Sequence, residues 1–417
     1  MKQDVWYDKM QYFAMLIMAA IMPVSWWLGL WAAGLLALTS FVKLVIQRHV
    51  GNPALGRGLR WALCVILAYW VVNAISMFYS ADLAMAKGIM ERKAVLLIFP
   101  PCFLLTDTSY LTPRHMRGIG YALLVSMITV IVYFIGRSVV GWMEGANMAQ
   151  ILTVEGNFDP RHHSYVALYA TIAGVFSYYE LYNYWEKLKA LHRSFLIVAL
   201  LLLVCYIVIV DSRAGILAMV LVAICCVLQQ IVRYHRWWLA LVAVLSLLVF
   251  FVGIPKVFPN HQNSITETVQ GIVERGVKGD YRLTINHASV EAFKENPLFG
   301  YGVGDYYEVF AEKCKKEAEG WAATNTHNQY MESLLAAGIP CLLALLLLLT
   351  TPIYFAVRHH SRYAFPLAMV TGVVMFNLLF ESMLERQMGL LFIGYLTSVM
   401  ALILSVEENK FCRMRKS

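Results

Sequence analysis

Apolar runs of about 18 or more residues recur from one end of this 417-residue sequence to the other. A helical run of that length reaches across the hydrocarbon core of a lipid bilayer. The composition agrees, since 60% of the residues are hydrophobic and only 14% are charged, whereas soluble domains carry roughly a quarter charged residues. The sequence therefore predicts an all-α, polytopic membrane protein rather than a soluble one.

We predict about twelve transmembrane helices from the positions of these runs. They lie at about 10–26, 29–47, 60–79, 93–108, 117–141, 164–184, 194–211, 214–232, 237–254, 328–355, 363–383 and 388–405. Three regions follow: 1–254 with the first nine spans, a loop at 255–325, and 326–417 with the last three spans and a tail. The first residues lead into a full-length span without a convincing cleavage site, so no cleavable signal peptide is expected.

Basic residues alternate between loops, and this alternation predicts the orientation of the chain. One set of connections is rich in Lys and Arg and nearly without acid: Lys43, Arg48, Arg57, Arg60, Arg114, Arg117, Lys187, Lys189, Arg193, Arg233, Arg236, Arg358, Arg362 and the tail at 410–416. These loops and both termini are expected to be cytoplasmic. Because the basic residues form no single patch, the net charge of +8 does not indicate nucleic-acid binding.

The other set of loops is then expected to face outward, at about 80–93, 144–163, 211–213, 255–325 and 382–387. The loop at 255–325 mixes acids and bases and is long enough for two or three helices on the membrane surface. Residues 264–275 and 282–294 both have the pattern of amphipathic helices, and Asn296 with Pro297 ends the second.

Four candidate residues lie at outward span ends: Arg213, Arg282, His327 and Arg386. Arg161, in an outward loop, is a fifth candidate. No charge rule requires arginine on this side of the membrane. One such Arg alone is more often an interfacial anchor. Together, two or three guanidinium groups would match the oxygens of a pyrophosphate and neutralise it as a leaving group. His327 is expected in the first turn of its helix, where the positive end of the helix dipole favours a neutral imidazole that can act as a base.

Other chemistry has weaker support in the sequence. The glycines at 300–304 could cradle a phosphate, but a turn after a broken helix is the better interpretation. Metal binding is not expected, because there is no Asp-x-Asp pair, no His-x-x-x-His helix and no cluster of outward carboxylates. Glu332 either orients a donor or holds its helix in the bundle, with the structural role slightly favoured.

Five segments together resemble the O-antigen ligase family, a superfamily that also includes O-antigen polymerases and some protein O-oligosaccharyltransferases. They are Asp-Ser-Arg-Ala-Gly at 211–215, Tyr-Arg-Leu at 281–283, Glu-Asn-Pro-Leu-Phe-Gly-Tyr-Gly-Val-Gly at 295–304, Thr-His-Asn-Gln-Tyr-Met-Glu-Ser-Leu-Leu-Ala-Ala-Gly at 326–338 and Glu-Ser-Met-Leu-Glu-Arg-Gln-Met-Gly at 381–389. The order and spacing are fairly specific, whereas no single segment is. The resemblance is strongest over about 205–400.

The resemblance implies a bundle similar to the GT-C class of membrane glycosyltransferases. It implies transfer of a glycan from undecaprenyl pyrophosphate to a sugar hydroxyl of lipid A–core at the periplasmic face of the bacterial inner membrane, with inversion and without a metal or other cofactor. By motif match, Arg213 and Arg282 would bind the pyrophosphate and His327 would be the essential histidine. Arg386, Arg161, Tyr281 and Asn328 are the candidate substrate-binding residues.

Two alternatives stay open at this point. A polymerase or a protein glycosyltransferase of the same superfamily would have much the same sequence. A lipid or glycan transporter would instead require charged or Gly/Pro-broken segments at mid-membrane and inverted repeats. The break at Pro100 and Pro101 has no counterpart in the other half of the chain, which disfavours a transporter.

Overall fold

The protein is described here from a computed structural model. The structure describes residues 5–145, 163–210, 212–235, 237–238, 241, 281–317 and 325–414, without the side chains of 281–283 and 410–414. All regular structure in these ranges is helical, as predicted for an all-α protein. The chain divides into two compact units: the first comprises 1–126, 284–371 and 378–417, and the second comprises 127–283 and 372–377.

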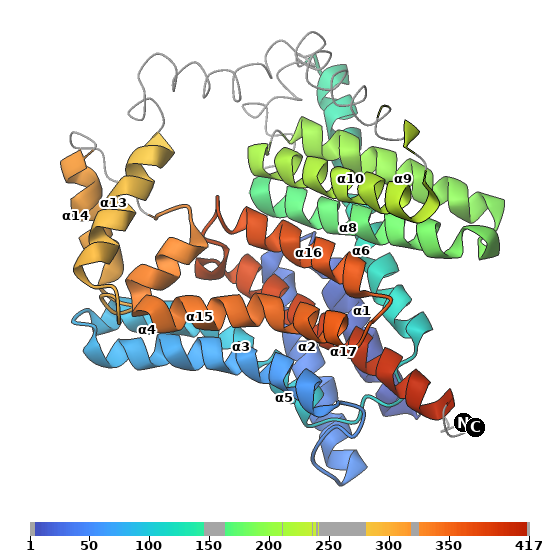
Figure 1. The fold of residues 1–417 in the computed structure, drawn as a ribbon, viewed down its shortest axis with the longest axis horizontal. Coiled ribbons are helices and arrows are strands. Elements are labelled where there is room, and N and C mark those ends of the chain that lie inside the picture. The colour runs from blue at the N-terminus through green and yellow to red at the C-terminus, as the bar shows by residue number, and fades with distance from the viewer. Residues whose placement is uncertain are drawn as a thin grey trace. The chain divides into compact units, whose positions relative to one another are not determined.

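The first unit contains most of the helices (Figure 1). They are α1 (Trp6–Ile21), α2 (Trp26–Gln47), α3 (Arg57–Ser76), η1 (Met77–Tyr79), α4 (Leu83–Lys93), η2 (Ala94–Leu97), α5 (Phe99–Leu104), the beginning of α6 (Pro113–Met143), most of α13 (Tyr281–Glu295), α14 (Tyr306–Glu317), α15 (Gln329–Arg358), most of α16 (Ala364–Asn377), η7 (Met383–Glu385) and α17 (Gln387–Met414). Helix α15 runs beside α3, and α1 beside α2.

Helix α17 is the central helix of this unit. The most apolar stretch of α17 is 89% buried, against 39% for α2 and for α3. It contacts α2, α3, α5 and α15. A helix that is enclosed on nearly all sides must be apolar all round, and the sequence of α17 is so up to its last turns.

One hydrophobic core joins α13 and α14 to α4 and to the first turns of α15. We call it the cap core. Its buried side chains are Ala86, Ile89, Met90, Ile285, Ala288, Ala292, Val303, Tyr306, Phe310, Cys314, Leu335 and Ala336. Helices α13 and α14 thus bury their apolar faces against protein, and they anchor the loop between the spans to the beginning of α15.

The second unit is built on α8 (His163–Tyr184), η4 (Trp185–Lys187), α9 (Ala190–Ile209) and α10 (Arg213–Tyr234). Helix α8 packs against both α9 and α10. The approach to α10 is close, since a Cβ on Gly215 would lie 2.4 Å from the Cβ of Ala167. Small residues at this crossing allow the two backbones to approach, as in membrane helix pairs generally.

Seven of the described helices are long and apolar enough to cross a membrane: α2, α3 extended to Tyr79, α6, α9, α10, α15 and α17 up to Asn409. The protein is therefore a polytopic helical membrane protein. The total of about twelve spans and the GT-C-like arrangement stay predictions. The expected span at 237–254 lies almost wholly outside the described residues, as does the expected helix at 264–275.

Residues 93–108 do not form one continuous helix. The segment contains the end of α4, the 3₁₀ turn η2 and the six-residue helix α5, with prolines in its first turn. Pro100 and Pro101 lack the backbone N–H that an uninterrupted helix would need, so the apolar run is broken there.

Candidate functional site

His327 lies in a turn just before α15. The helix begins at Gln329 with Asn328 as its N-cap, so the expectation that His327 occupies the first helical turn is wrong. The backbone of His327 is left-handed (φ 49°), and its N–H donates to Oδ1 of Asn325 at 3.2 Å. The helix dipole therefore acts less strongly on this imidazole, because its field is strongest at the N–H groups of the first turn.

The side chain of Asn328, a candidate substrate-binding residue, caps α15. Its Oδ1 accepts hydrogen bonds from the backbone N–H of Tyr330 at 3.0 Å and of Met331 at 3.3 Å. These are two of the donors that every helix leaves unsatisfied at its beginning. The cap therefore fixes the point at which the His327 turn meets the helix.

Glu332 holds this turn from inside the protein. Its side chain is fully buried, and Oε1 accepts hydrogen bonds from the N–H and Oγ1 of Thr326 and from Oγ of Ser382, at 2.9, 3.1 and 3.0 Å. One carboxylate oxygen thus joins the His327 turn to the segment that leads to Arg386. Of the two roles considered for Glu332, the contacts favour the structural one.

Glu381 faces His327, a relationship that the sequence analysis missed. The His327 Nδ1 and the Glu381 Oε2 lie 4.0 Å apart, with 28% and 8% of the respective side chains exposed. This distance is longer than a hydrogen bond, so the two groups are charge neighbours and not a hydrogen-bonded pair. The available signal was an acidic residue at the edge of an apolar span, within the last of the resembling segments.

A second buried network lies between α4, η7 and the beginning of α15. The ammonium of Lys93, only 1% exposed, contacts Glu385 Oε1 at 2.8 Å and Asn73 Oδ1 at 2.9 Å. Gln329 donates through Nε2 to the same Glu385 oxygen at 3.3 Å and accepts the Leu384 N–H at 2.6 Å. We call this network the lysine clamp. It fixes the turn directly before Arg386.

The glycine-rich loop at 300–304 forms a turn and not a phosphate cradle. Tyr301 and Gly302 donate their N–H groups to the carbonyls of Leu335 and Ala336, at 2.8 and 3.0 Å. The N–H groups of Val303 and Gly304 donate to Ser76 Oγ and Ser80 Oγ, at 3.2 and 3.0 Å. Since these donors are used within the protein, the loop has no row of N–H groups to offer an anion.

The same loop packs into a break in α15. Ala337 and Gly338 leave the helical conformation, and Gly338 has φ 67° and ψ −158°. A Cβ there would lie 2.1 Å from the carbonyl oxygen of Leu298, so only glycine fits both the backbone angle and the space. Pro340 follows two positions later, at the start of the longer part of the helix.

The candidate arginines are distributed over both units. Arg213 is the first residue of α10 in the second unit, directly after the N-cap Ser212, whose Oγ accepts the Gly215 N–H at 3.2 Å. Arg386 lies in the first unit, exposed, between η7 and α17. Because Arg213 and His327 belong to different units, their convergence stays a prediction.

Three candidate side chains lie outside the described residues. Arg161 is one of them, and for Tyr281 and Arg282 the structure describes the backbone alone, which begins α13. The predicted amphipathic helix at 282–294 is confirmed by α13, which ends at Glu295, directly before Asn296 and Pro297. Arg282 thus opens a helix that is anchored in the cap core.

The long apolar helices identify an integral membrane protein. The His327 turn and the lysine clamp form a polar site at the ends of these helices. Residues 198–347, about a third of the chain, match the model of the family described as O-antigen ligase. This match confirms, over this region, the resemblance seen in the sequence. The matched region includes Arg213, Arg282 and His327, whereas Arg161 and Arg386 lie outside it.

A relative in Haemophilus influenzae, an uncharacterized protein, is 34% identical over 76 residues. The aligned part is 17% of this chain and 19% of that protein. The match therefore spans about a fifth of the relative and supports local similarity alone.

Proposed function

We propose that this protein is an O-antigen ligase of the bacterial inner membrane. It would transfer a glycan from undecaprenyl pyrophosphate to a sugar hydroxyl of lipid A–core at the periplasmic face. The observation that carries the proposal is the match to the O-antigen ligase family over the region that includes Arg213, Arg282 and His327. The periplasm lacks ATP, so a transferase there needs a donor that is already activated, and a lipid pyrophosphate is such a donor.

The proposed reaction is a single displacement. The acceptor hydroxyl oxygen attacks the anomeric carbon, and the bond from that carbon to the pyrophosphate oxygen breaks on the opposite face, which inverts the centre. The electron pair leaves with undecaprenyl pyrophosphate, and Arg213 and Arg282 stabilise the negative charge that develops on it. His327 takes the proton of the hydroxyl at Nε2. No metal is needed in this scheme.

The neighbours of His327 support this assignment. Glu381 lies 4.0 Å from Nδ1, and a shorter contact during the reaction would favour the tautomer that leaves Nε2 as the base. Glu332 holds the Thr326 backbone that precedes His327. The lysine clamp would place Arg386 on the same rim, where its exposed guanidinium could contact the glycan or the phosphates. Arg161, Tyr281 and Asn328 are further candidates for substrate binding. Because the Asn328 side chain caps α15, its backbone is the part that would contact the substrate.

The test is transfer by the purified protein from undecaprenyl-pyrophosphate glycan to lipid A–core, with and without a chelator. We expect product in both conditions. We expect Arg213→Ala, Arg282→Ala and His327→Ala each to lower the rate by at least about a hundredfold, the range for loss of an electrostatic or acid–base group. Arg358→Ala, at the other end of α15, is the matched control and should keep the wild-type rate.

Near-normal transfer by the Arg213 or Arg282 variant, with correct membrane insertion, would remove the leaving-group role. Loss of product with chelator would remove the metal-free scheme.

The superfamily alternatives are separated by the lipopolysaccharide of a deletion strain. Loss of a ligase leaves core without O-antigen, whereas loss of a polymerase leaves one repeat on each core. A normal lipopolysaccharide ladder would favour the protein O-oligosaccharyltransferase, whose acceptor is a protein. Failure of every transfer assay, together with substrate movement across the membrane, would favour the transporter alternative.

A further inference from the structure

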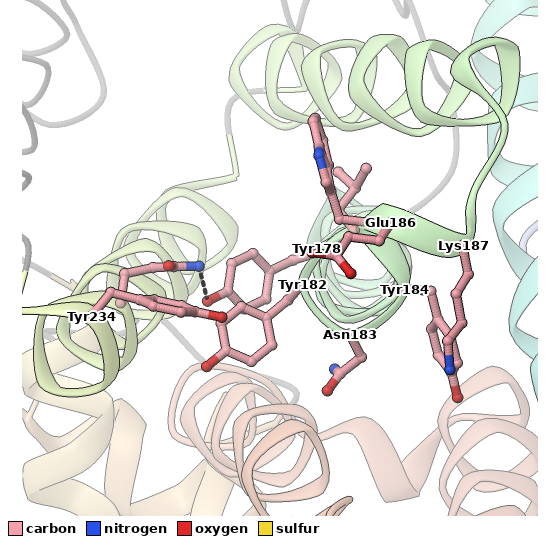
Figure 2. Close-up of a pocket in the computed structure, with 10 residues that line it drawn as sticks. Tyr178, Tyr182, Asn183, Tyr184, Glu186, Lys187 and Tyr234 are labelled. Carbon is pink, nitrogen blue, oxygen red and sulfur yellow. Dashed lines mark hydrogen bonds between the residues drawn. The ribbon is translucent and has the colours of Figure 1, made fainter.

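A pocket of about 630 Å³ lies in the second unit, at the end of α8 and α10 that is remote from Arg213 (Figure 2). Its lining comes from the last turns of α8, from η4 and from the last turns of α10: Tyr178, Leu181, Tyr182, Asn183, Tyr184, Trp185, Glu186, Lys187, Gln230 and Tyr234. None of these residues takes part in the proposed transfer. The pocket therefore requires its own explanation.

The position of the pocket places it at the level of lipid headgroups. Helix α10 runs for 22 residues from Arg213 to Tyr234 and qualifies as a membrane span, which makes it roughly 33 Å long at 1.5 Å per residue. Its Tyr234 end is therefore at one membrane surface. Tyrosine and tryptophan are the residues that prefer this level, because one end of each ring system is apolar and the other is polar.

Cationic side chains surround the pocket. The guanidinium of Arg233 lies over the rings of Tyr182 and Tyr234, at 5.0 and 5.6 Å, and donates to the Tyr182 hydroxyl at 3.0 Å. Arg193 lies over the ring of Trp185 at 4.9 Å. Lys187 and Glu186 both line the pocket, whereas Arg233 and Arg193 lie beside it, against rings of its lining. With these two arginines the cations at the pocket outnumber the acid, which favours a negatively charged occupant.

The tyrosine hydroxyls form an ordered wall. In Figure 2, Tyr178, Tyr182 and Tyr234 gather on one side of the pocket, and Tyr184 and Lys187 lie together on the other. Tyr178 and Tyr182 stack at 5.6 Å, and the Tyr178 hydroxyl accepts from Gln230 at 3.2 Å and donates to Gln229 at 2.9 Å. The Tyr182 hydroxyl accepts from Arg233, which polarises it as a donor toward an anion.

We propose that this pocket binds the phosphate headgroup of an anionic phospholipid from the adjacent leaflet. Lys187 and the Tyr182 hydroxyl would contact the phosphate from the lining. Arg233 would add its charge from behind Tyr182 and Tyr234, the two lining residues that it contacts. Trp185 and the apolar faces of the tyrosine rings lie where the glycerol and the first acyl carbons would run. Basic pockets between membrane helices commonly hold such headgroups. The sequence expectation that this end is cytoplasmic agrees, since anionic lipids give that leaflet its negative surface.

The test is native mass spectrometry of the full-length protein in detergent, titrated with phosphatidylglycerol or with phosphatidylcholine. We expect phosphatidylglycerol to bind preferentially, and Arg233→Ala with Lys187→Ala to weaken that binding about tenfold or more, as expected for loss of charge-assisted hydrogen bonds. Arg358→Ala is a matched control, because Arg358 also lies over a tyrosine ring, that of Tyr354 at 5.8 Å, and donates to its hydroxyl at 2.6 Å. The groove beside Tyr354 is apolar, so this variant should bind as the wild type does.

Thermal unfolding of each variant without added lipid checks that the fold is retained, and Tyr182→Phe gives a second test that leaves both cations in place. Equal weakening in the Arg358 variant would overturn the proposal, since it would show charge attraction without a site. Equal binding of phosphatidylcholine, or displacement of phosphatidylglycerol by millimolar inorganic phosphate, would also overturn it.

Discussion

The backbone of His327 is the residue-scale feature on which the proposed chemistry depends. A non-glycine residue in the left-handed region costs roughly 1 kcal/mol, and it persists only where its surroundings impose it. Here the surroundings are the Glu332 carboxylate, the Asn325 side chain and the Asn328 cap. The imidazole is thus positioned by a turn with several independent restraints, which is a requirement for a base that must meet a hydroxyl in one geometry.

Glu332→Ala should loosen this turn and lower stability by about 2–4 kcal/mol, because it leaves buried donors on Thr326 and Ser382 without their acceptor. Transfer should fall with it. Glu332→Gln keeps an acceptor oxygen of the same reach and should retain most of both properties. Thermal unfolding in detergent and the transfer rate measure the two effects. An alanine variant with wild-type stability would show that these bonds do not hold the turn.

At the residue scale the sequence placed His327 near the beginning of a long apolar helix but did not indicate which residues contact it. His327 was recognisable from its segment, whereas Glu381 lies 54 positions later and reaches it through the packing of the unit. Lys43 and Lys93 have the sequence context of ordinary basic loop residues, yet each is 1% exposed and paired with an acid distant in sequence, Asp8 or Glu385. Local pattern carries no information about such long-range pairs.

At the scale of elements, α15 consists of two pieces with different neighbours. The short piece before Gly338 packs into the cap core through Leu335 and Ala336. The longer piece begins at Pro340 and runs beside α3. The glycine-rich loop occupies the break and satisfies the carbonyls that an interrupted helix exposes.

Gly338→Ala should lower stability by at least about 3 kcal/mol, since the new methyl group meets the Leu298 carbonyl and the left-handed backbone excludes a side chain. Gly34→Ala is the control. Gly34 lies inside α2 with open space around it, and alanine there should be neutral or stabilising by up to about 1 kcal/mol. The stability of both variants is measured by their unfolding temperature and by the yield of protein inserted in the membrane. Equal behaviour of the two variants would contradict the tight packing at the break.

The lysine clamp is an element-scale tie, because it joins α3, α4, η7 and α15. Lys93→Met should cost about 3–5 kcal/mol, since it leaves Glu385 buried without its cation. Adding Glu385→Leu should recover a large part of that loss. Lys87→Met removes an exposed partner of Glu91 at 3.9 Å and should cost less than about 1 kcal/mol. Additive losses at Lys93 and Glu385 in a double-mutant cycle would show that the pair is not coupled.

Helix positions were predictable wherever an apolar run was long and ended in a clear signal. The predicted spans at 60–79, 194–211 and 214–232 correspond to α3, α9 and α10 within a few residues. The segment at 93–108 was assigned as one span from its hydropathy, although its prolines were recognised as a break, and it proved to be three short pieces. The break in α15 was not predicted either: Gly338 and Pro340 signal it in the sequence, but the loop that fills it comes from elsewhere in the chain.

For the whole molecule, the distribution of charge predicts which side of the membrane each end of the bundle faces. The His327 turn and the loop at 80–93 are expected outside, and the loop between α8 and α9 inside. Leu83 begins α4 and Leu191 lies in the first turn of α9, directly after the loop from α8. They are 60% and 84% exposed, so they form a matched pair for labelling.

In a variant without the native cysteines, Leu83→Cys should react with a membrane-impermeant maleimide in intact spheroplasts. Leu191→Cys should react with the maleimide only after the membrane has been permeabilised. The degree of labelling, read from a gel, gives the sidedness directly. The reverse pattern would put the proposed reaction in the cytoplasm and would remove the basis for a periplasmic ligase.

The break in α15 has a consequence for how the protein tolerates different bilayers. Because the histidine turn is fastened to the cap core and the membrane-crossing piece begins after Gly338, a change in bilayer thickness would act on the two pieces of α15 separately. The reacting end would then stay at constant depth. A break of this kind would let one arrangement of the histidine turn serve membranes of unequal width.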